Sequence, residues 1–159
     1  MEQLTGRCGC GHVTYGLRRQ PLIIHCCHCT DCQRETGSAF AINVLIEAEE
    51  VEIFTGAPEA VLTPSESGSG QKIWRCPHCK VAMWSNYNGA KDAVHFVRAG
   101  TLDQARSITP DIHIYTRSKV PWVSIPQGAR AAEEYYDVPE VWPAESLKRR
   151  DIYLTKRRS

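Results

Sequence analysis

Seven of the eight cysteines in this chain are grouped at the spacing of metal ligands. They form the pairs Cys8/Cys10 and Cys76/Cys79 and the triple Cys27, Cys29 and Cys32. Tetrahedral zinc takes four ligands, so two pairs complete a closed site, whereas a triple leaves one position for another ligand. Closed sites stabilise folds and open sites do chemistry. The spacing therefore predicts two zinc ions per chain, one structural and one chemically active.

Two other uses of these cysteines are weaker. A disulfide framework suits secreted proteins, but the first residues, MEQLTGRCGCGHVTYG, lack the apolar core of a signal peptide. Disulfides are rare in the cytosol, where metal binding is the commoner use of such clusters. A redox pair at Cys29/Cys32 or Cys76/Cys79 would need a strand-then-helix unit of the thioredoxin type, and neither pair clearly has one. We therefore expect a cytoplasmic metalloprotein.

The length of chain between the ligands indicates which clusters share an ion. Cys27, Cys29 and Cys32 can bind one ion within a few residues. The two distant pairs would then close a long loop, which removes disorder from the unfolded chain and stabilises the fold. Cys26 directly precedes Cys27, and neighbouring side chains of an extended segment point to opposite faces. We predict that Cys26 is a buried thiol, with a role as an additional or alternative ligand as the other possibility.

Length and charge narrow the class of protein. A chain of 159 residues suggests one domain with a real core. The net charge of +1 gives no reason to expect nucleic acid as a partner. No apolar run approaches the ~20 residues that cross a membrane. Basic residues crowd the last positions, and we expect them to form a solvated tail rather than a nucleic-acid arm; they are Lys148, Arg149, Arg150, Lys156, Arg157 and Arg158.

The elements that must position the cysteines are mostly β-strands. Apolar alternation and short apolar runs predict strands at residues 12–17, 22–24, 39–46, 51–55, 60–63, 72–75, 81–84, 94–98 and 113–116. Residues 33–36 are predicted as one helical turn before Gly37, and short helices are expected at 129–136 and 145–150. The composition of residues 64–70, PSESGSG, indicates either a flexible rim or a long hairpin turn. We expect a β domain over residues 1–128, with residues 129–159 as an extension that packs on it or trails from it.

The histidines beside the clusters admit several roles. His28 lies within the triple and His78 within the second pair. Each either ligates a metal, forms a hydrogen bond to a metal ligand, or is a polar residue on an exposed turn, and we predict the exposed turn for both. His25 either supports the open site or ends a strand. His113 is a candidate for a ligand pocket.

The cysteine clusters and the segments around them, in this order, resemble the glutathione-dependent formaldehyde-activating enzyme family. That family also includes a domain of a vertebrate centromere protein. The matching segments lie between about residue 4 and residue 124. They are GRCGCGHVTY at 6–15, CHCTDCQR at 27–34, Gly37-Ser38, RCPHC at 75–79, GTLD at 100–103, Pro110, His113 and KVPW at 119–122. One departure is Lys80, because family members usually carry a glycine or similarly small residue just after the second cysteine of this pair.

The resemblance implies a zinc-bound, β-tent-like fold of small stacked antiparallel sheets, with short helical segments near the C-terminus. It implies a structural zinc on Cys8, Cys10, Cys76 and Cys79 and an exchangeable zinc on Cys27, Cys29 and Cys32. It also suggests glutathione as the thiol and formaldehyde as the aldehyde, with Arg34, Gly37, Ser38, His113 and Trp122 as candidates for the pocket.

The chemistry expected of a three-thiolate zinc agrees with that implication. Its natural fourth ligand is water or another thiolate, and a bound thiol loses its proton. Such a sulfur can attack an aldehyde or leave from its adduct, so the predicted activity is that of a carbon–sulfur lyase acting on S-hydroxymethylglutathione. The alternatives are a zinc-knuckle module that binds a thiol, a protein or a nucleic acid without catalysis, and a structural protein with two inert zinc ions.

Overall fold

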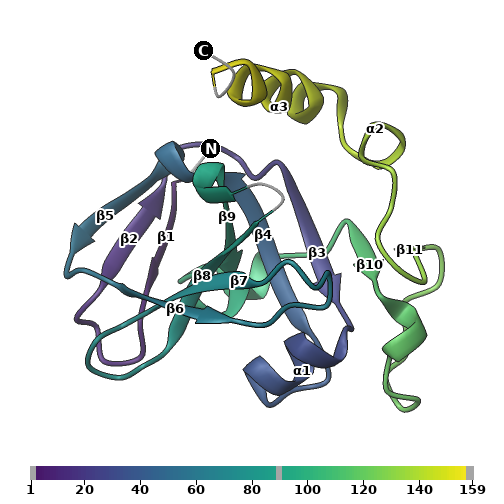
Figure 1. Cartoon of the computed structure of the whole chain (residues 1–159), viewed down its shortest axis with the longest axis horizontal. Helices are drawn as coiled ribbons and strands as arrows, with labels where there is room; N and C mark the ends of the chain where they lie inside the picture. The colour runs from purple at the N-terminus through teal and green to yellow at the C-terminus, as the bar shows by residue number, and fades with distance from the viewer. Residues whose placement is uncertain (1–2, 89–90, 157–159) are drawn as a thin grey trace.

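The computed structural model of the chain describes residues 3–88 and 91–156, and strands dominate it (Figure 1). The strands are β1 (Leu4–Arg7), β2 (Thr14–Leu17), β3 (Ile23–Cys27), β4 (Ala41–Glu47), β5 (Val51–Thr55), β6 (Glu59–Thr63), β7 (Gln71–Arg75), β8 (Ala82–Tyr87), β9 (Val94–Arg98), β10 (Ile112–Ile114) and β11 (Arg130–Ala131). The α-helices are α1 (Thr30–Thr36), α2 (Val138–Val141) and α3 (Ala144–Lys156). The predicted mostly β fold is confirmed, and every predicted strand overlaps an observed one.

The strands form two sheets in the described part of the chain. The smaller sheet has the order β1-β2-β5, and the larger has the order β11-β10-β3-β4-β9-β8-β7-β6. Their pairs are antiparallel, except that β10 runs parallel to both β3 and β11. The predicted antiparallel sheets are thus confirmed, although the larger one has eight strands in the described residues and a parallel edge formed by β10 and β11.

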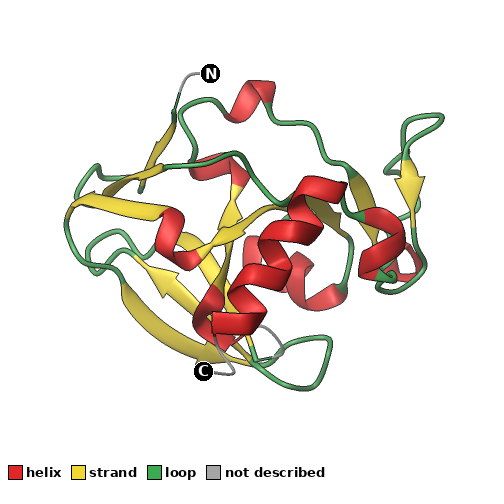
Figure 2. Ribbon diagram, turned by 90° about the horizontal axis from the view of Figure 1, so that it is seen from above, coloured by secondary structure: helices red, strands yellow, loops and turns green. Residues whose placement is uncertain are grey.

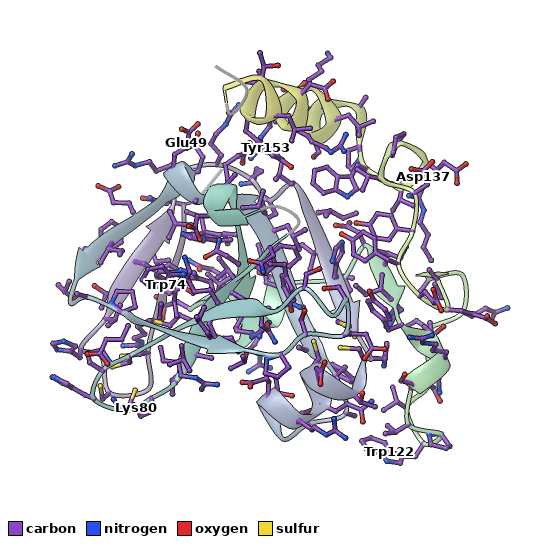
Figure 3. The ribbon with its side chains drawn as sticks, in the orientation of Figure 1. Glu49, Trp74, Lys80, Trp122, Asp137 and Tyr153 are labelled. Atoms are coloured by element: carbon purple, nitrogen blue, oxygen red, sulfur yellow. The ribbon has the colours of Figure 1, made fainter. Side chains whose placement is uncertain are left out.

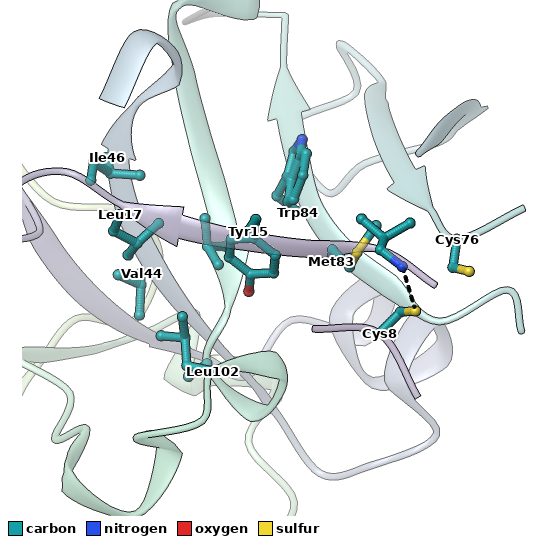
Figure 4. Close-up of a cluster of buried hydrophobic side chains, with 12 residues drawn as sticks. Cys8, Tyr15, Leu17, Val44, Ile46, Cys76, Met83, Trp84 and Leu102 are labelled. Atoms are coloured by element: carbon teal, nitrogen blue, oxygen red, sulfur yellow. Dashed lines mark hydrogen bonds between the residues drawn. The ribbon is translucent and has the colours of Figure 1, made fainter. Parts of the chain in front are cut away.

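One hydrophobic core fills the space between the two sheets (Figure 4). Tyr15 of β2 and Trp84 of β8 are buried there, and their rings meet edge to face with centroids 5.2 Å apart, a favoured geometry for aromatic pairs. Cys8 and Cys76 belong to the same core and lie at one end of it. Two of the predicted structural ligands are therefore buried in the core of the protein.

A second core lies on the other face of the larger sheet. Along β4, Val44 and Ile46 face the first core and Leu45 faces the second, as the alternation of side chains in a strand requires. Trp142 and Leu147, from the C-terminal segment, pack into this second core. Figure 2 shows α3 lying across the sheet.

Polar contacts also connect α3 to the sheet. Arg149 donates from its guanidinium to both carboxylate oxygens of Glu47 at the end of β4, with an Nε–Oε1 distance of 2.9 Å. The two side chains are only 7% and 6% exposed. The prediction of a solvated basic tail is therefore wrong for Arg149, although Lys148 is exposed. Arg157 and Arg158 lie outside the described residues.

The helix predicted at residues 129–136 is wrong. Arg130 and Ala131 form β11, which pairs with Ile112 and His113 of β10. Backbone groups along the edge of β10 give this alanine-rich segment hydrogen-bond partners, and that tertiary pairing overrides its helical propensity. The helix predicted at 145–150 is confirmed, since it lies within α3.

A search for membrane-spanning segments gives a negative result: no helix in the described ranges has the length and apolar character that crossing a bilayer requires.

Candidate metal centres and their cavity

Four thiols meet where the loop after β1 approaches the turn between β7 and β8. The Sγ atoms of Cys8, Cys10, Cys76 and Cys79 all lie within 4.8 Å of one another. The Cys10 sulfur is 3.6 Å from that of Cys8 and 3.7 Å from that of Cys76. Sulfurs at about 2.3 Å from a tetrahedral zinc stand about 3.8 Å apart. Donor set and spacing therefore fit a closed zinc site.

The backbone around Cys76 and Cys79 forms a tight turn that gathers the two thiols. The Lys80 N–H donates to the Cys76 carbonyl, and the Cys76 N–H donates to the Val81 carbonyl, both at 3.0 Å. Lys80 has a φ of 62°, a left-handed conformation that costs a residue with a Cβ about 1–2 kcal/mol. A glycine avoids this cost. Lys80, which stands where a small residue is usual, thus adopts the conformation of the turn and adds backbone strain to it.

The cysteine triple is held by a change from strand to helix. Cys27 ends β3, Cys29 is the N-cap of α1, and Cys32 lies within α1. Their Sγ atoms lie within 4.8 Å of one another, and each side chain is 4% exposed. The Cys32 N–H donates to the Cys29 sulfur at 3.3 Å, which satisfies one free donor of the helix end. Gly37, with a φ of 63°, ends the helix where the sequence predicted.

These three thiols do not ionise independently. Hydrogen bonds from Cys27 and Cys32 lower the pKa of the Cys29 thiol. The hydrogen bond with Cys29 raises the pKa of Cys27. One negative charge in the group therefore opposes the next, until a cation compensates it. Three buried sulfurs around one point suit a thiophilic ion such as zinc, and the donor set fits an open zinc site.

A cavity of about 450 Å³ opens onto the triple, a volume within the range of small-molecule sites. All three cysteines of the triple line it, together with the aromatic rings of Tyr87, Phe96, Tyr115 and Tyr135. The loop between β6 and β7 adds Ser65, Glu66, Ser67 and Ser69. Residues 64–70 therefore form both a hairpin connection and part of the cavity wall.

The charges around the cavity are mostly acidic and already paired. Asp31 and Glu66 line it, and no lysine or arginine does so among the described residues. Arg34 lies 3.7 Å from Asp31, and Arg117 lies 2.7 Å from Glu66. A ligand inside the cavity thus meets aromatic surface, sulfur and a few polar groups.

His25 shares a face of β3 with Cys27 and lines the cavity. The Trp142 indole N–H donates to the Tyr136 hydroxyl at 2.7 Å, and that hydroxyl lies 2.5 Å from Nε2 of His25. Burial raises the pKa of Tyr136 to about 12, so the hydroxyl keeps its proton. Because an indole can only donate, we assign the tyrosine proton to the bond with Nε2.

The proton of the imidazole then sits on Nδ1. Burial lowers the pKa of His25 to about 3, so the ring is neutral and carries a single N–H. Nδ1 is buried and has no hydrogen-bond partner in the residues that the structure covers. The cavity wall thus includes a ring with an unused donor.

The five residues predicted for the thiol pocket do not line the cavity. Arg34, Gly37 and Ser38 are exposed at the end of α1 or just beyond it. Trp122 is 78% exposed and projects from the body of the protein (Figure 3). His113 of β10 is buried, and it stands in register with Cys26 of β3. Cys26 faces away from the cavity because its neighbour Cys27 faces into it.

The prediction for His28 is wrong, and that for His78 is confirmed. His28 is completely buried, whereas His78 is exposed. Nε2 of His28 lies 2.9 Å from Nδ1 of His113 and 3.6 Å from the sulfur of Cys26. Cys26 is 2% exposed, as predicted for a buried thiol. The backbone explains the error, since the His28 N–H donates to the Ile114 carbonyl and continues the pairing of β3 with β10.

Sequence reasoning missed the contribution of the C-terminal segment to the cavity. Tyr135 and Tyr136 fell within the helix predicted at 129–136, and Trp142 carried no motif. The one available signal was the density of aromatic residues between positions 135 and 142, which is unusual for a solvated extension.

Comparison with protein families gives the family of this chain. A family model described as "Glutathione-dependent formaldehyde-activating enzyme" matches residues 3–118, a range that contains all seven clustered cysteines. A crystal structure of a protein from Rhodobacter sphaeroides is similar with a TM-score of 0.48 and 20% identity, over 67% of this chain and 91% of that one. A search of curated proteins finds no match. The chain belongs to the glutathione-dependent formaldehyde-activating enzyme family.

Proposed function

We propose that the protein binds a small thiol, glutathione first among the candidates, at a zinc ion held by Cys27, Cys29 and Cys32, and makes or breaks the carbon–sulfur bond of its adduct with an aldehyde such as formaldehyde. The observation that carries this proposal is the cavity of about 450 Å³ that opens onto three buried thiols. Family membership supports it. We also propose that a second zinc, on Cys8, Cys10, Cys76 and Cys79, is structural.

The atoms of this reaction balance without an oxidant or a reductant. In the synthetic direction a sulfur–carbon bond forms, the carbonyl π bond opens, and the thiol proton ends on the new hydroxyl oxygen. A zinc ion, when bound at the triple, would hold the incoming sulfur as a thiolate and so supply the nucleophile. The side chains of the cavity orient the thiol and limit the access of water.

The imidazole of His25 offers a hydrogen-bond donor for the aldehyde oxygen, which gains negative charge as the sulfur attacks the carbonyl carbon. Negative charge on the carbonyl oxygen is stabilised by a hydrogen-bond donor that is already oriented. The Nδ1–H of His25 is an unused donor in a residue of the cavity lining, and the bond from Tyr136 to Nε2 fixes its tautomer. We propose that Nδ1–H donates to the aldehyde oxygen, or to the hydroxyl oxygen of the adduct in the reverse direction.

Replacing His25 tests this role. His25→Phe should lower the rate of adduct formation above the uncatalysed background by about 100-fold, the usual effect of removing one such donor. Zinc content and thiol binding should not change. The measurement is exchange NMR of the thiol, formaldehyde and their adduct, with His95→Phe on β9 as a control that lies outside the cavity lining. A His25→Phe protein with the wild-type rate would exclude the donor role.

Native mass spectrometry with and without glutathione tests the proposed function itself. The wild-type protein should carry two zinc ions and gain one glutathione, whereas Cys29→Ala should keep one zinc and bind no thiol. The control is Thr30→Ala, because Thr30 lies between Cys29 and Cys32 and is exposed. This variant should bind zinc and glutathione like the wild-type protein. Two zinc ions without an adduct, or an adduct that persists in Cys29→Ala, would contradict the proposal.

The same experiment asks what part of glutathione is recognised. Because no described lysine or arginine lines the cavity, we expect the two carboxylates of glutathione to stay in solvent at its mouth. Glutathione diethyl ester should then bind at least as tightly as glutathione. A tenfold loss with the ester would instead reveal a carboxylate-binding group.

A further inference from the structure

A second group of metal-ligating side chains lies behind the triple, on the opposite face of β3. Side chains alternate along a strand, so Cys26 and His28 share the face that Cys27 avoids. On the neighbouring parallel strand β10, His113 stands in register with Cys26. The pairing of β3 with β10 therefore brings one sulfur and two imidazoles together, although some 85 positions separate them in the sequence.

The spacing of the three donor atoms suits a single ion. The sulfur of Cys26, a ring nitrogen of His28 and one of His113 all lie within 4.8 Å of one another. The sulfur-to-Nε2 distance of 3.6 Å is the same as a sulfur–sulfur spacing in the four-cysteine cluster. Ligands at about 2.0–2.3 Å from one ion stand roughly 3.3–3.8 Å apart. The 2.9 Å between the imidazoles would need to widen by about half an ångström.

Hydrogen bonds within the group satisfy these buried side chains only in part. Cys26, His28 and His113 are 2%, 0% and 9% exposed. Nδ1 of His28 is buried without a partner in the described ranges, and the Cys26 sulfur has a long contact of 3.6 Å with Nε2 of His28. Polar groups are costly to bury without partners. An ion bound to the Cys26 sulfur, Nε2 of His28 and the ring of His113 would give these three groups a common partner, and the Cys26 thiol would release its proton to solvent on binding.

Charge selects among the ions that such donors accept. One thiolate and two neutral imidazoles together carry a charge of −1, and no carboxylate belongs to the group. A monovalent ion leaves the buried group neutral, whereas a divalent ion leaves a buried positive charge, which is unfavourable. Thiolate and imidazole ligands suit both Cu⁺ and Zn²⁺, so the charge of the group decides between these two ions.

We propose that Cys26, His28 and His113 form a third metal site, which binds one Cu⁺ ion and shares no ligand with either cysteine cluster. The proposal does not depend on the thiol chemistry of the cavity, because the two sites lie on opposite faces of the same strand.

The test counts and identifies the metals on each chain. Full-length protein loaded with zinc receives one equivalent of Cu⁺ without oxygen, and native mass spectrometry should show two zinc ions and one copper. X-ray absorption at the copper edge should show one sulfur and two nitrogen neighbours. Cys26→Ala and His113→Gln should each lose the copper and keep both zinc ions. His95→Gln, a half-buried histidine of β9 outside the group, should keep all three metals.

Three outcomes would overturn the proposal. Copper that displaces zinc and shows only sulfur neighbours would place it in a cysteine cluster. Copper that persists in a folded Cys26→Ala or His113→Gln protein would exclude these ligands. A third zinc bound in preference to copper would refute the charge argument. If Cys26→Ala fails to fold, His113→Gln decides, since glutamine preserves a polar side chain at the most accessible of the three positions.

Discussion

Cys76→Ala should unfold the protein at room temperature, whereas Cys29→Ala should leave it folded. Cys76 is completely buried in the first core and completes a four-sulfur site that joins the N-terminal loop to the middle of the chain. Structural zinc contributes about 10–16 kcal/mol in small zinc domains at neutral pH, and a whole domain is stable by only about 5–15 kcal/mol. We expect Cys76→Ala to lose at least about 5 kcal/mol of unfolding free energy. Cys29 belongs to the open triple, so its loss should cost about 1–2 kcal/mol.

Urea unfolding followed by circular dichroism, with zinc content measured on the same samples, separates the two variants. The pair forms its own control, because each substitution replaces one buried cysteine by alanine. Similar losses of stability in both variants would refute the division between a structural site and a chemical one.

Arg149→Ala should cost about 3–5 kcal/mol of unfolding free energy. The substitution leaves the carboxylate of Glu47 buried without its partner, and it removes the bond from Arg149 to the Gln20 carbonyl at 2.8 Å. Lys148→Ala, on the same helix in an exposed pair with Glu145, should change stability by less than about 0.5 kcal/mol. Chemical unfolding of both variants measures the difference.

A double substitution separates the burial of charge from the docking of α3. Arg149→Met with Glu47→Leu replaces the ion pair by apolar side chains of similar size, and it should recover most of the lost stability. A small loss in Arg149→Ala would show that the pair is open to water. From these contacts we propose that residues 129–156 belong to the same domain as the β-sheets that precede them.

Local patterns in the sequence were enough to predict most strands and the grouping of the cysteines. The run KIWR at residues 72–75 alternates and leads into Cys76, so the strand and the turn after it follow from neighbouring residues alone. The same holds for α1, where Gly37 supplies the left-handed residue that ends the helix. Each of these features depends on contacts within a few positions.

Features that depend on distant pairing were not predictable. From the local sequence His28 is expected in a turn, but its N–H pairs with Ile114 of β10 and so continues the pairing of β3 with that strand. His113 is expected in a pocket, but its register with Cys26 places it on the other side of the sheet. The cavity donor at His25 requires Tyr136, more than a hundred residues later. No local pattern encodes such contacts, because they arise from the order of strands in the larger sheet.

The position of Tyr135 on the cavity wall has a consequence for how the protein is made. Ribosomes add about 5–20 residues per second, so roughly 5–20 seconds pass between the synthesis of Cys32 and that of Tyr135. During this interval the triple exists without the segment that later encloses it. The emerging chain thus offers its thiols to a metal donor before the cavity is complete. Loading and enclosure are then separate events in time, and metal delivered late would have to enter through the mouth of the cavity, past the aromatic side chains that line it.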